Sequence, residues 1–416
     1  MQTTKPSWKK LNSSSRHLNS MAVTKKELID EALERGVAAA YPSKPAVKKA
    51  LESGKKLRIY LGIDPTGVLH IGHGVQLLKL RQFQQLGHEI TILFGGMTAR
   101  IGDPTDKLAA RQPLTKAEVT RNAQEYKKLI GKILDLKKTR FVDNATWLEK
   151  LTLSDLIKLA SEFTVQRLLE RDMFQQRLTA GKPIHLHEFL YPIMQGYDSV
   201  VLDTDLEIGG SDQTFNMLAG RMLFERLKHK EKFVITTKLL EDPTGKKMGK
   251  SEGNFVAFKD QPNDMYGKVM SWPDTVIKVG FEIATTVPFS ELKQVELDLK
   301  RGKNPKILKM LLAYKIVELY HGAKAAIAAE ENFKQVFEEK LNPDEMPRFK
   351  LKTRNIVDAL VETKLASSKS EARRLLAQQA IRLDTKIITD VNYQIGSIDA
   401  DGVVLQRGKR HFAKII

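Results

Sequence analysis

The spacing of apolar residues predicts alternating helices and strands in the first part of the chain. Apolar and charged residues follow a helical period from about Lys25 to Leu33. Apolar runs at 57–63 and 89–94 predict strands, and the segment from about His70 to Leu86 between them predicts a helix. Such a strand–helix–strand unit pairs its two strands in parallel through a right-handed crossover. The first domain is therefore expected to be α/β.

The pattern changes after this unit. Residues 115–197 read mostly as helices, and Thr115 with Glu118 forms a capping box at the start of one of them. Strands are predicted again at 203–210 and 232–237, with a helix between them, and helices follow after 248. Asn304-Pro305 begins one of these helices, and Gly322 ends it. Residues 341–347 read as a linker, and a small α+β module runs from 350 to the end.

Composition narrows the class of protein. A chain of 416 residues is expected to form two or three domains. The absence of cysteine excludes disulfides, thiolate zinc sites and cysteine nucleophiles, and it fits a reducing compartment. No stretch approaches the roughly 20 apolar residues of a membrane-spanning helix. The net charge of +18 favours binding to polyanions, although a basic protein without a nucleic-acid partner fits the charge alone equally well.

The first residues carry no fold signal. Residues 1–20 are basic and rich in serine, contain no acidic residue and lack the apolar run of a secretory signal. The sequence therefore predicts a disordered basic tail over 1–24, or a chain that properly begins at Met21.

Candidate chemistry first appears where the first strand meets its helix. The segment 64–73 reads Asp-Pro-Thr-Gly-Val-Leu-His-Ile-Gly-His. In open α/β sheets ligands bind at this end of the strands, and a helix N-terminus suits phosphate. His70 and His73 share one face of the first helical turn, and Gly72 leaves room for a nucleotide. From spacing alone, the two histidines could be packing or surface residues or, less readily, zinc ligands, because no acidic or thiol partner for a zinc ion is obvious nearby.

A second cluster lies far along the chain. Residues 245–251 read Gly-Lys-Lys-Met-Gly-Lys-Ser, which alone is typical of a solvated turn. Together with His-Ile-Gly-His at 70–73, it resembles the two signatures of class I aminoacyl-tRNA synthetases, HIGH and KMSKS. The order and wide separation of the two segments also match that family.

The resemblance implies a set of phosphate-binding residues. Attack of a carboxylate on the α-phosphate of ATP is catalysed mainly by positioning and by electrostatic stabilisation of the transition state. The family pattern implies that the phosphates are contacted by Thr66, His70 and His73, by a closing loop with Lys247, Lys250 and Ser251, and by a mobile basic pair, Lys107 and Arg111.

A polar stripe on a predicted helix points to the amino-acid substrate. Tyr191, Gln195 and Asp198 are spaced i, i+4 and i+7, so they lie along one helical face. This stripe could be a pocket wall, a satisfied buried network or an exposed face. With Tyr60 and the segments Gly-Asp-Pro-Thr at 102–105 and Gly-Gly-Ser-Asp-Gln at 209–213, it resembles the tyrosyl branch of the class I synthetases.

That branch implies roles for each matching residue. Tyr60 and Asp198 would hold the substrate phenol, Asp103, Tyr191 and Gln195 the α-amino group, and Gln213 would lie near the carboxylate. The nucleotide would be contacted by Gly62, Asp64, Gly72, Gly210, Asp212 and Leu240.

The last module carries a basic helix. Ser368 and Glu371 form a predicted capping box, and a basic face is formed by Lys364, Lys369, Arg373 and Arg374, with Arg407, Lys409 and Arg410 adding to it. In isolation this face could be only a solvated helix. The module resembles a small RNA-binding module shared with a ribosomal protein, which implies contacts to folded RNA through shape and phosphates.

The resemblance covers residues 25–416. It implies a Rossmann-type parallel-sheet catalytic domain at 25–270 with a helical insertion at about 112–190, an α-helical anticodon-side domain at 271–342 and an α+β RNA-binding module at 350–416. It implies tyrosine, ATP with Mg²⁺ on its phosphates, and tRNA(Tyr) as ligands, with no protein-built metal site, and a cytoplasmic homodimer. The competing hypotheses are a tryptophanyl synthetase and an RNA-binding protein that has lost catalysis.

Overall fold

The computed structural model describes residues 24–102, 115–242, 255–337 and 346–416, except 385, 397, 399–401, 409 and 410. Contacts divide the chain into two units, Met1–Gly249 with Lys278–Glu296 and Lys250–Ile277 with Leu297–Ile416. Residues 278–296, which lie within the predicted helical domain 271–342, thus group with the first unit. No helix among the described residues combines the length and the apolar character that a membrane span requires.

The first unit is built on a six-stranded sheet of order β1-β6-β5-β2-β3-β4. Its strands are β1 (Val37–Tyr41), β2 (Arg58–Ile63), β3 (Glu89–Phe94), β4 (Thr139–Asp143), β5 (Leu206–Gly210) and β6 (Phe233–Thr237). All neighbours pair in parallel except β1, which runs antiparallel to β6. The predicted parallel α/β fold is therefore confirmed.

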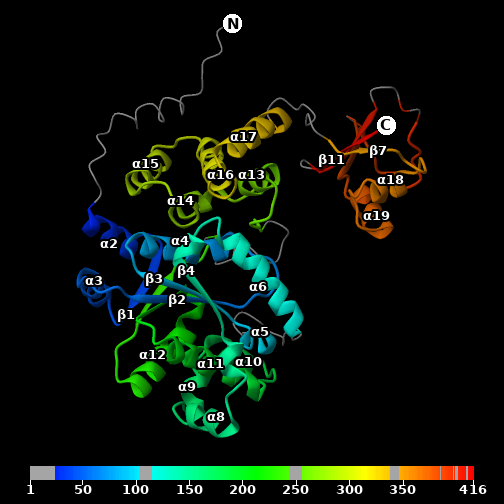
Figure 1. Cartoon of the computed structure of the whole chain (residues 1–416). Helices are drawn as coiled ribbons and strands as arrows, with labels where there is room; N and C mark the ends of the chain where they lie inside the picture. Colours follow the sequence, from blue (N-terminus) through cyan, green and yellow to red (C-terminus); the bar gives the residue numbers. More distant parts are fainter. Residues whose placement is uncertain are drawn as a thin grey trace. The chain divides into compact units, whose positions relative to one another are not determined.

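Helices cover both faces of this sheet. The helices of the first unit are α2 (Lys25–Glu34), α3 (Lys44–Glu52), α4 (Ile71–Gln85), α5 (Thr98–Ile101), α6 (Lys116–Ile130), α7 (Ala145–Leu148), α8 (Leu153–Ala160), α9 (Val165–Leu169), α10 (Asp172–Thr179), α11 (Leu186–Leu202), α12 (Thr214–Lys228), α14 (Ile277–Ala284) and most of α15 (Phe289–Lys300). Figure 1 shows α4 on one face and α11 with α12 on the other. The crossovers from β2 and from β5 lead in opposite directions along the sheet, which places their helices on opposite faces.

Two strands were not predicted. β4 lies inside the segment that reads as helical, and β1 has the sequence Val-Ala-Ala-Ala-Tyr. Alanine favours helices, and both strands lie at the edges of the sheet, where only pairing with a neighbour makes them strands.

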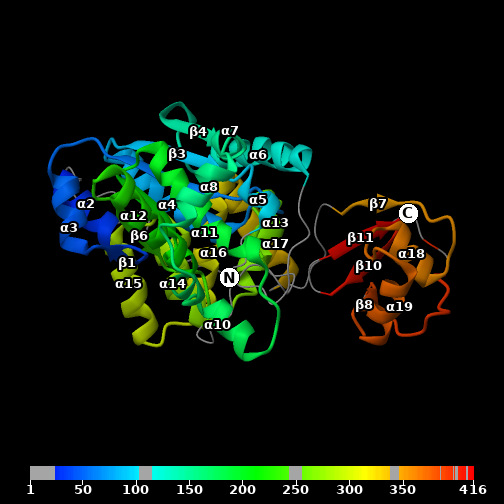
Figure 2. The same ribbon diagram turned by 90° about the horizontal axis from the view of Figure 1, so that it is seen from below.

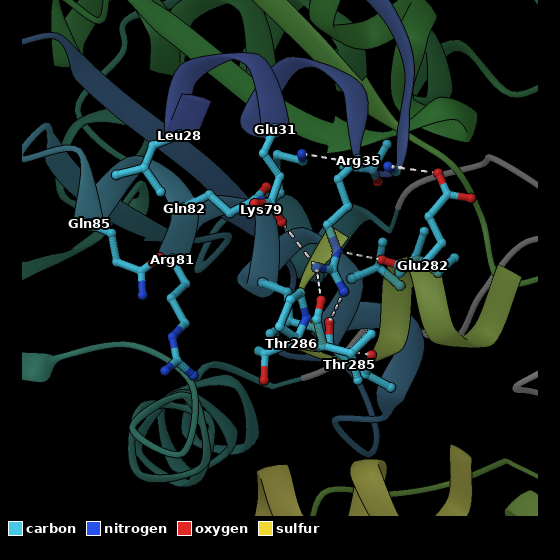
Figure 3. Close-up of a pocket in the computed structure, with 17 residues that line it drawn as sticks. Leu28, Glu31, Arg35, Lys79, Arg81, Gln82, Gln85, Glu282, Thr285 and Thr286 are labelled. Atoms are coloured by element: carbon cyan, nitrogen blue, oxygen red, sulfur yellow. Dashed lines mark hydrogen bonds and ion pairs between the residues drawn. The ribbon is translucent and has the colours of Figure 1, made fainter. Parts of the chain in front are cut away.

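Arg35 holds the returning segment 278–296 in the first unit. Its guanidinium donates to the carbonyl oxygens of Glu282, Val287 and Thr285 at 2.8, 2.6 and 2.7 Å. These acceptors lie at and just beyond the C-terminal end of α14, where helix carbonyls lack partners. Figure 3 shows this arrangement beside a cavity of about 340 Å³.

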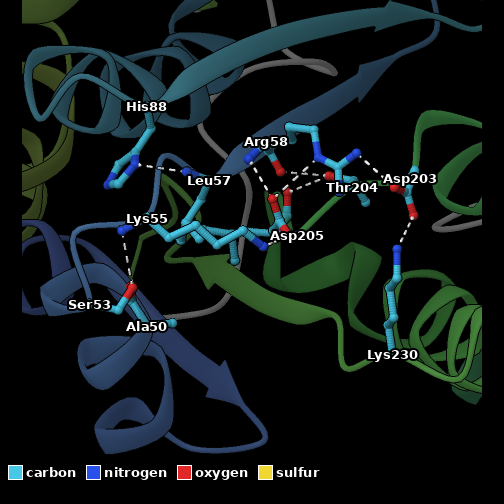
Figure 4. A network of polar contacts seen from close by, with 11 residues as sticks. Ala50, Ser53, Lys55, Leu57, Arg58, His88, Asp203, Thr204, Asp205 and Lys230 are labelled. Carbon is cyan, nitrogen blue, oxygen red and sulfur yellow. Dashed lines mark hydrogen bonds and ion pairs between the residues drawn. The ribbon is translucent and has the colours of Figure 1, made fainter.

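The amino ends of β2 and β5 are joined by charged side chains. Asp205 accepts from the backbone N–H of Arg58 at 2.8 Å and from the Lys55 ammonium at 2.7 Å, and Arg58 also reaches Asp203 at 2.7 Å (Figure 4). This network fixes the register of the two central strands at the edge opposite their carboxyl ends.

The second unit contains helices and a smaller sheet. Its helices are α13 (Pro262–Met270), α16 (Pro305–His321), α17 (Ala323–Phe337), α18 (Ile356–Glu362) and α19 (Lys369–Ala377). Asn304 caps α16 by accepting from the N–H of Lys306, and Gly322 ends it with φ of 86°, as predicted. Tyr266 of α13 donates to the carbonyl of Met310 at 3.2 Å, and its ring centroid lies 5.3 Å from that of Phe333, so α13, α16 and α17 share one core.

The last residues form an α+β module with its own core. Its five-stranded sheet has the order β7-β11-β10-β8-β9, from β7 (Arg348–Phe349), β8 (Ile381–Leu383), β9 (Lys386–Ile387), β10 (Val403–Arg407) and β11 (His411–Ile415). Figure 2 shows these strands beside α18 and α19. The buried apolar residues that form the core of this module all come from residues 356–415, which confirms the predicted small C-terminal α+β module.

Candidate active site

The candidate site lies at the carboxyl ends of β2 and β5. From β2 the chain proceeds through α4 to β3, and from β5 through α12 to β6 on the other side. The strand order therefore reverses between these two neighbours, and ligands of open α/β sheets bind at such a point. Tyr60 lies on β2, Asp64 directly follows it, and Gly210 ends β5.

His70 and His73 form the N-terminal cap of α4. The His70 ring accepts from the N–H of Gly72 at 3.1 Å, and the His73 ring accepts from the N–H of His70 at 3.3 Å. Their ring centroids are 4.1 Å apart. Both rings thus share one face of the first turn, as the spacing predicts, at the helix end that favours anions.

Gly72 is required by the cap itself. A Cβ atom on Gly72 would lie 2.8 Å from the Cε1 atom of His70 and 2.9 Å from its Nδ1 atom. The absent side chain therefore leaves room for the His70 ring to fold back onto the backbone. The expected room for a nucleotide stays a prediction.

Asp64 joins the first turn to α11. Its carboxylate accepts from the Tyr191 hydroxyl at 2.9 Å and from the Thr98 hydroxyl at 2.8 Å. Gly95 makes space for it, because a Cβ atom there would lie 1.8 Å from an Asp64 oxygen. Two predicted site residues far apart in sequence are thus in direct contact.

Asp198 is a buried carboxyl with two donors. It is 1% exposed, accepts from the Trp147 indole N–H at 2.8 Å and accepts from the Asn144 amide at 3.1 Å. Burial raises the pKa of the Asp198 carboxyl to about 8, although these two hydrogen bonds oppose the shift. The Asp198 carboxyl therefore titrates near neutral pH.

Tyr60 and Gln195 complete the polar wall. The Tyr60 hydroxyl lies 2.8 Å from the Ser199 hydroxyl, and the Gln195 amide donates to Glu207 at 3.0 Å. Burial raises the pKa of the Tyr60 phenol well above its ordinary value, and the neighbouring carboxylates add to this. Of the three open interpretations, the Tyr191–Gln195–Asp198 stripe is not an exposed face, since Tyr191 and Asp198 are buried and Gln195 is half-buried.

Several partners of this wall were not among the sequence-predicted residues. They are Thr98, Asn144, Trp147, Ser199, Glu207 and Lys232. Ser199 directly follows Asp198, so adjacency could have indicated it. Asn144 and Trp147 follow β4, a strand that the sequence pattern does not reveal.

The remaining candidate residues surround the ends of the strands. Gln213 accepts from the Asn216 amide at 2.9 Å, and a Cβ atom on Gly210 would lie 2.4 Å from an Asp212 oxygen. Thr66 follows the turn at Asp64, Gly62 is exposed on β2, and Leu240 is buried beyond β6. Asp103, Lys107, Arg111, Lys247, Lys250 and Ser251 lie outside the described residues.

The predicted RNA-binding residues are exposed on the C-terminal module. Lys364, Lys369, Arg373 and Arg374 lie on or before α19. Lys369 pairs with Asp358 at 2.7 Å. Arg407 pairs with Glu371 at 3.1 Å and donates to the carbonyl of Leu365, so it joins the sheet to the helix. The Glu371 carboxylate reaches the N–H of Ser367 in place of Ser368, so only half of the predicted capping box forms.

Within the described ranges, no group of three or more His, Asp or Glu side chains is arranged to hold a metal ion. The His70–His73 pair therefore has no third ligand among those residues.

Two family models together cover most of the chain. The model described as “tRNA synthetases class I (W and Y)” matches residues 52–338. The model described as “Tyrosine--tRNA ligase SYY-like C-terminal domain” matches residues 337–415.

Individual relatives agree with this. The tyrosine–tRNA ligase of Moorella thermoacetica is 44% identical over 92% of this chain and 94% of its own length. The tyrosine–tRNA ligase of Thermotoga maritima is also 44% identical, over 92% of this chain and 96% of its own length. Among solved structures, a C-terminally truncated mitochondrial tyrosyl-tRNA synthetase of Aspergillus nidulans has a TM-score of 0.64 at 22% identity, over 79% of this chain and 98% of that one. The chain therefore belongs to the tyrosine–tRNA ligases of the class I tRNA synthetase family.

Proposed function

We propose that this tyrosine–tRNA ligase binds tyrosine and ATP at the carboxyl ends of β2 and β5. The carboxylate of tyrosine attacks the α-phosphorus of ATP, and pyrophosphate leaves; Mg²⁺ would neutralise charge on the phosphates. A 3′-terminal hydroxyl of tRNA(Tyr) then attacks the carbonyl carbon of the adenylate, and AMP leaves. The buried Asp198 carboxyl, in the same unit as a helix cap built of two histidines, is the observation that carries this assignment.

The phenol end of tyrosine is assigned to Tyr60 and Asp198. A buried carboxyl with only two donors keeps acceptor capacity for a phenol hydroxyl. Phenylalanine would leave this remaining acceptor capacity without a donor, and enzymes of this type are the established example of such discrimination, rejecting phenylalanine by roughly 10⁵-fold. A tyrosyl-tRNA synthetase of Archaeoglobus fulgidus has been solved with L-tyrosine, and its fold matches this chain with a TM-score of 0.59.

The other end of tyrosine is assigned to the polar stripe of α11. Tyr191 and Gln195, with Asp103, would bind the α-ammonium group, and Gln213 would lie near the carboxylate. The support is that Tyr191 and Gln195 are held by fixed carboxylates, Asp64 and Glu207.

The phosphates are assigned to the N-terminus of α4. His70 and His73 already present their rings on its first turn, and Thr66 precedes them. Lys107, Arg111, Lys247, Lys250 and Ser251 would supply further donors. Donors that engage only in the transition state raise kcat more than they raise substrate affinity. The adenosine part would contact Gly62, Asp64, Gly72, Gly210, Asp212 and Leu240.

We further propose a cytoplasmic homodimer and an RNA-binding role for α19. Large apolar side chains are exposed on the helices that follow β4, including Leu153 at 73%, Ile157 at 60% and Leu186 at 79%. Such a surface is typical of an interface. The exposed basic residues Lys364, Lys369, Arg373 and Arg374 fit phosphate contacts to tRNA.

ATP–pyrophosphate exchange without tRNA tests the assignment. We expect exchange with tyrosine and none with phenylalanine or tryptophan. His70→Ala should lower the exchange rate by about 100-fold or more, since it removes a transition-state contact. Asp198→Ala should abolish the selection of tyrosine over phenylalanine. Unchanged rates in the first variant, or unchanged selection in the second, contradict the roles given to these residues.

A further inference from the structure

A lysine ammonium is enclosed behind the proposed tyrosine pocket. Lys232 directly precedes β6, and its side chain is 0% exposed. It forms an ion pair with Glu207, which is 2% exposed, and donates to the Ser199 hydroxyl at 2.7 Å. Burial lowers the pKa of Lys232, while the Glu207 carboxylate opposes that shift. A buried ion pair is costly in stability, so this one calls for a functional reason.

Two chains of contacts start at this ammonium. Through Ser199 it reaches the Tyr60 hydroxyl, which lies 2.8 Å from the serine oxygen. Through Glu207 it reaches the Gln195 amide, which donates to the other carboxylate oxygen at 3.0 Å. Tyr60 and Gln195 are the residues proposed for opposite ends of the substrate.

The second chain determines which atom Gln195 can offer. An ionised carboxylate only accepts hydrogen bonds, so Gln195 must direct its NH₂ group to Glu207. Its carbonyl oxygen is then the atom left for a ligand, and that oxygen suits an ammonium group. Were Glu207 to lose its cation, an uncompensated carboxylate would be left buried, and Gln195 would no longer be held in this orientation.

The first chain orders the phenol-binding hydroxyl. The ammonium has only donors, so Ser199 must accept from it. This leaves Ser199 one proton and one lone pair for its remaining contacts, among them the Tyr60 oxygen at 2.8 Å. The Tyr60 hydroxyl is thereby held in place before a substrate arrives.

The helices are shaped to admit this cation. A Cβ atom on Gly220 of α12 would lie 2.9 Å from the Lys232 nitrogen and 3.3 Å from the Ser199 oxygen. A Cβ atom on Gly196 of α11 would lie 3.3 Å from the Cα atom of Gly220. The two glycines let α11 and α12 approach closely while leaving the space that the ammonium fills.

We propose that Lys232 is a positioning residue for tyrosine, which orients Tyr60 through Ser199 and Gln195 through Glu207. The inference rests on the proposed roles of Tyr60 and Gln195. Lys232 does not contact the substrate in this proposal, but it orients a side chain at each end of the tyrosine pocket.

The test compares two buried lysines of the same unit. Lys232→Met should raise the KM for tyrosine in pyrophosphate exchange by about 10- to 100-fold, as misplaced binding groups do, with the KM for ATP little changed. Lys79→Met is the matched control. Lys79 is 4% exposed and donates to the backbone carbonyls of Ala32 and Arg35, not to the pocket. Its loss should lower the melting temperature without raising the KM for tyrosine.

A pair of ligands separates positioning from a general loss of structure. 3-(4-Hydroxyphenyl)propanoate has the phenol and carboxylate of tyrosine but no amino group. Lys232→Met should weaken L-tyrosine more than this competitive inhibitor, because only tyrosine requires the Gln195 carbonyl. Equal weakening of both ligands would refute the Gln195 part of the inference.

Ser199→Ala removes the contact to Tyr60 but keeps the Lys232–Glu207 ion pair. It therefore tests the inference even if Lys232→Met does not fold. It should lower the preference for tyrosine over phenylalanine by about tenfold, since only tyrosine uses the Tyr60 hydroxyl. If Lys232→Met and Ser199→Ala behave as wild type while Asp198→Ala loses selection, the role of Lys232 is refuted and the pocket stands. If Asp198→Ala also keeps the selection of tyrosine over phenylalanine, the proposed tyrosine pocket itself is refuted.

Discussion

Asp198, proposed to bind the substrate phenol, has a pKa raised to about 8. Its raised pKa of about 8 means that the free enzyme holds this carboxyl largely protonated at lower pH. A phenol hydroxyl donates best to the ionised form, so binding of tyrosine should release a proton. Affinity should therefore rise with pH up to about 8, by at most about tenfold per pH unit, and then level off.

The KM for tyrosine measured between about pH 6 and 9 checks this expectation, with Asp198→Asn as the variant that should flatten the profile. The free energy of unfolding should change with pH in the opposite direction to the affinity for tyrosine. Between the ordinary pKa of 3.8 and about 8 the folded state binds the extra proton, so the free energy of unfolding falls as pH rises. A wild-type KM that is independent of pH would contradict ionisation on binding.

Gln379 shows how one residue can conflict with its backbone. It follows α19 with φ of +56°, a left-handed conformation that favours glycine. Gln378 beside it has φ of −79°, which suits any residue. Gln379→Gly should raise the free energy of unfolding of this module by up to about 1 kcal/mol, because it relieves the strain.

Gln378→Gly is the matched control and should instead destabilise by about 0.5–1 kcal/mol through backbone entropy. Urea unfolding of both variants measures the difference. Equal destabilisation by the two glycines would show that the left-handed conformation carries no strain.

Helices α10 and α11 are joined by a buried ion pair. Arg177 and Glu188, 4% and 6% exposed, form two parallel contacts at 2.5 and 2.8 Å. Burial alone would raise the pKa of Glu188, but the Arg177 guanidinium and the hydrogen bond from the His185 N–H together outweigh it, so the pKa lies below its ordinary value. Arg177→Met should cost about 3–5 kcal/mol, because the carboxylate is left buried without its cation.

The double variant Arg177→Met with Glu188→Leu should recover much of this loss, since no buried charge remains. Thermal unfolding of the three proteins at neutral pH checks the expectation. The single variant should be less impaired at low pH, where Glu188 is protonated. A single variant as stable as wild type would contradict the account.

The elements that the sequence reveals are those with a strong local pattern. The βαβ unit and α16 have clear periodicity, and the structure forms them where predicted, while α11 continues to Leu202, past the predicted helical segment 115–197. β1 and β4 have little pattern of their own and exist because of their neighbours in the sheet. Asn144 and Trp147 reach Asp198 only because β4 brings them there. Glu207 on β5 and Lys232 just before β6 carry no sequence signal of their own, because only the close approach of α11 and α12 at two glycines encloses them.

At the scale of the whole molecule, the proposed roles place amino-acid activation and RNA binding in different parts of the chain. The described residues that are assigned to tyrosine and ATP all belong to the first unit. The C-terminal module has a separate hydrophobic core, and the two family models divide the chain at 337–338. A chain ending at Phe337 should therefore retain tyrosine-dependent pyrophosphate exchange, whereas its aminoacylation of tRNA should fall by about tenfold or more through lost phosphate contacts.

Charge substitutions in the complete chain test the same separation without truncation. Replacing Lys364, Arg373 and Arg374 by Gln removes exposed charges whose side chains form no ion pair among the described residues. The slope of log affinity for tRNA against log salt concentration should become shallower by about 0.7 for each lost contact. Pyrophosphate exchange in the same protein is the internal control and should be unaffected. If exchange falls together with tRNA affinity, the module supports activation as well, and the two functions are not separable.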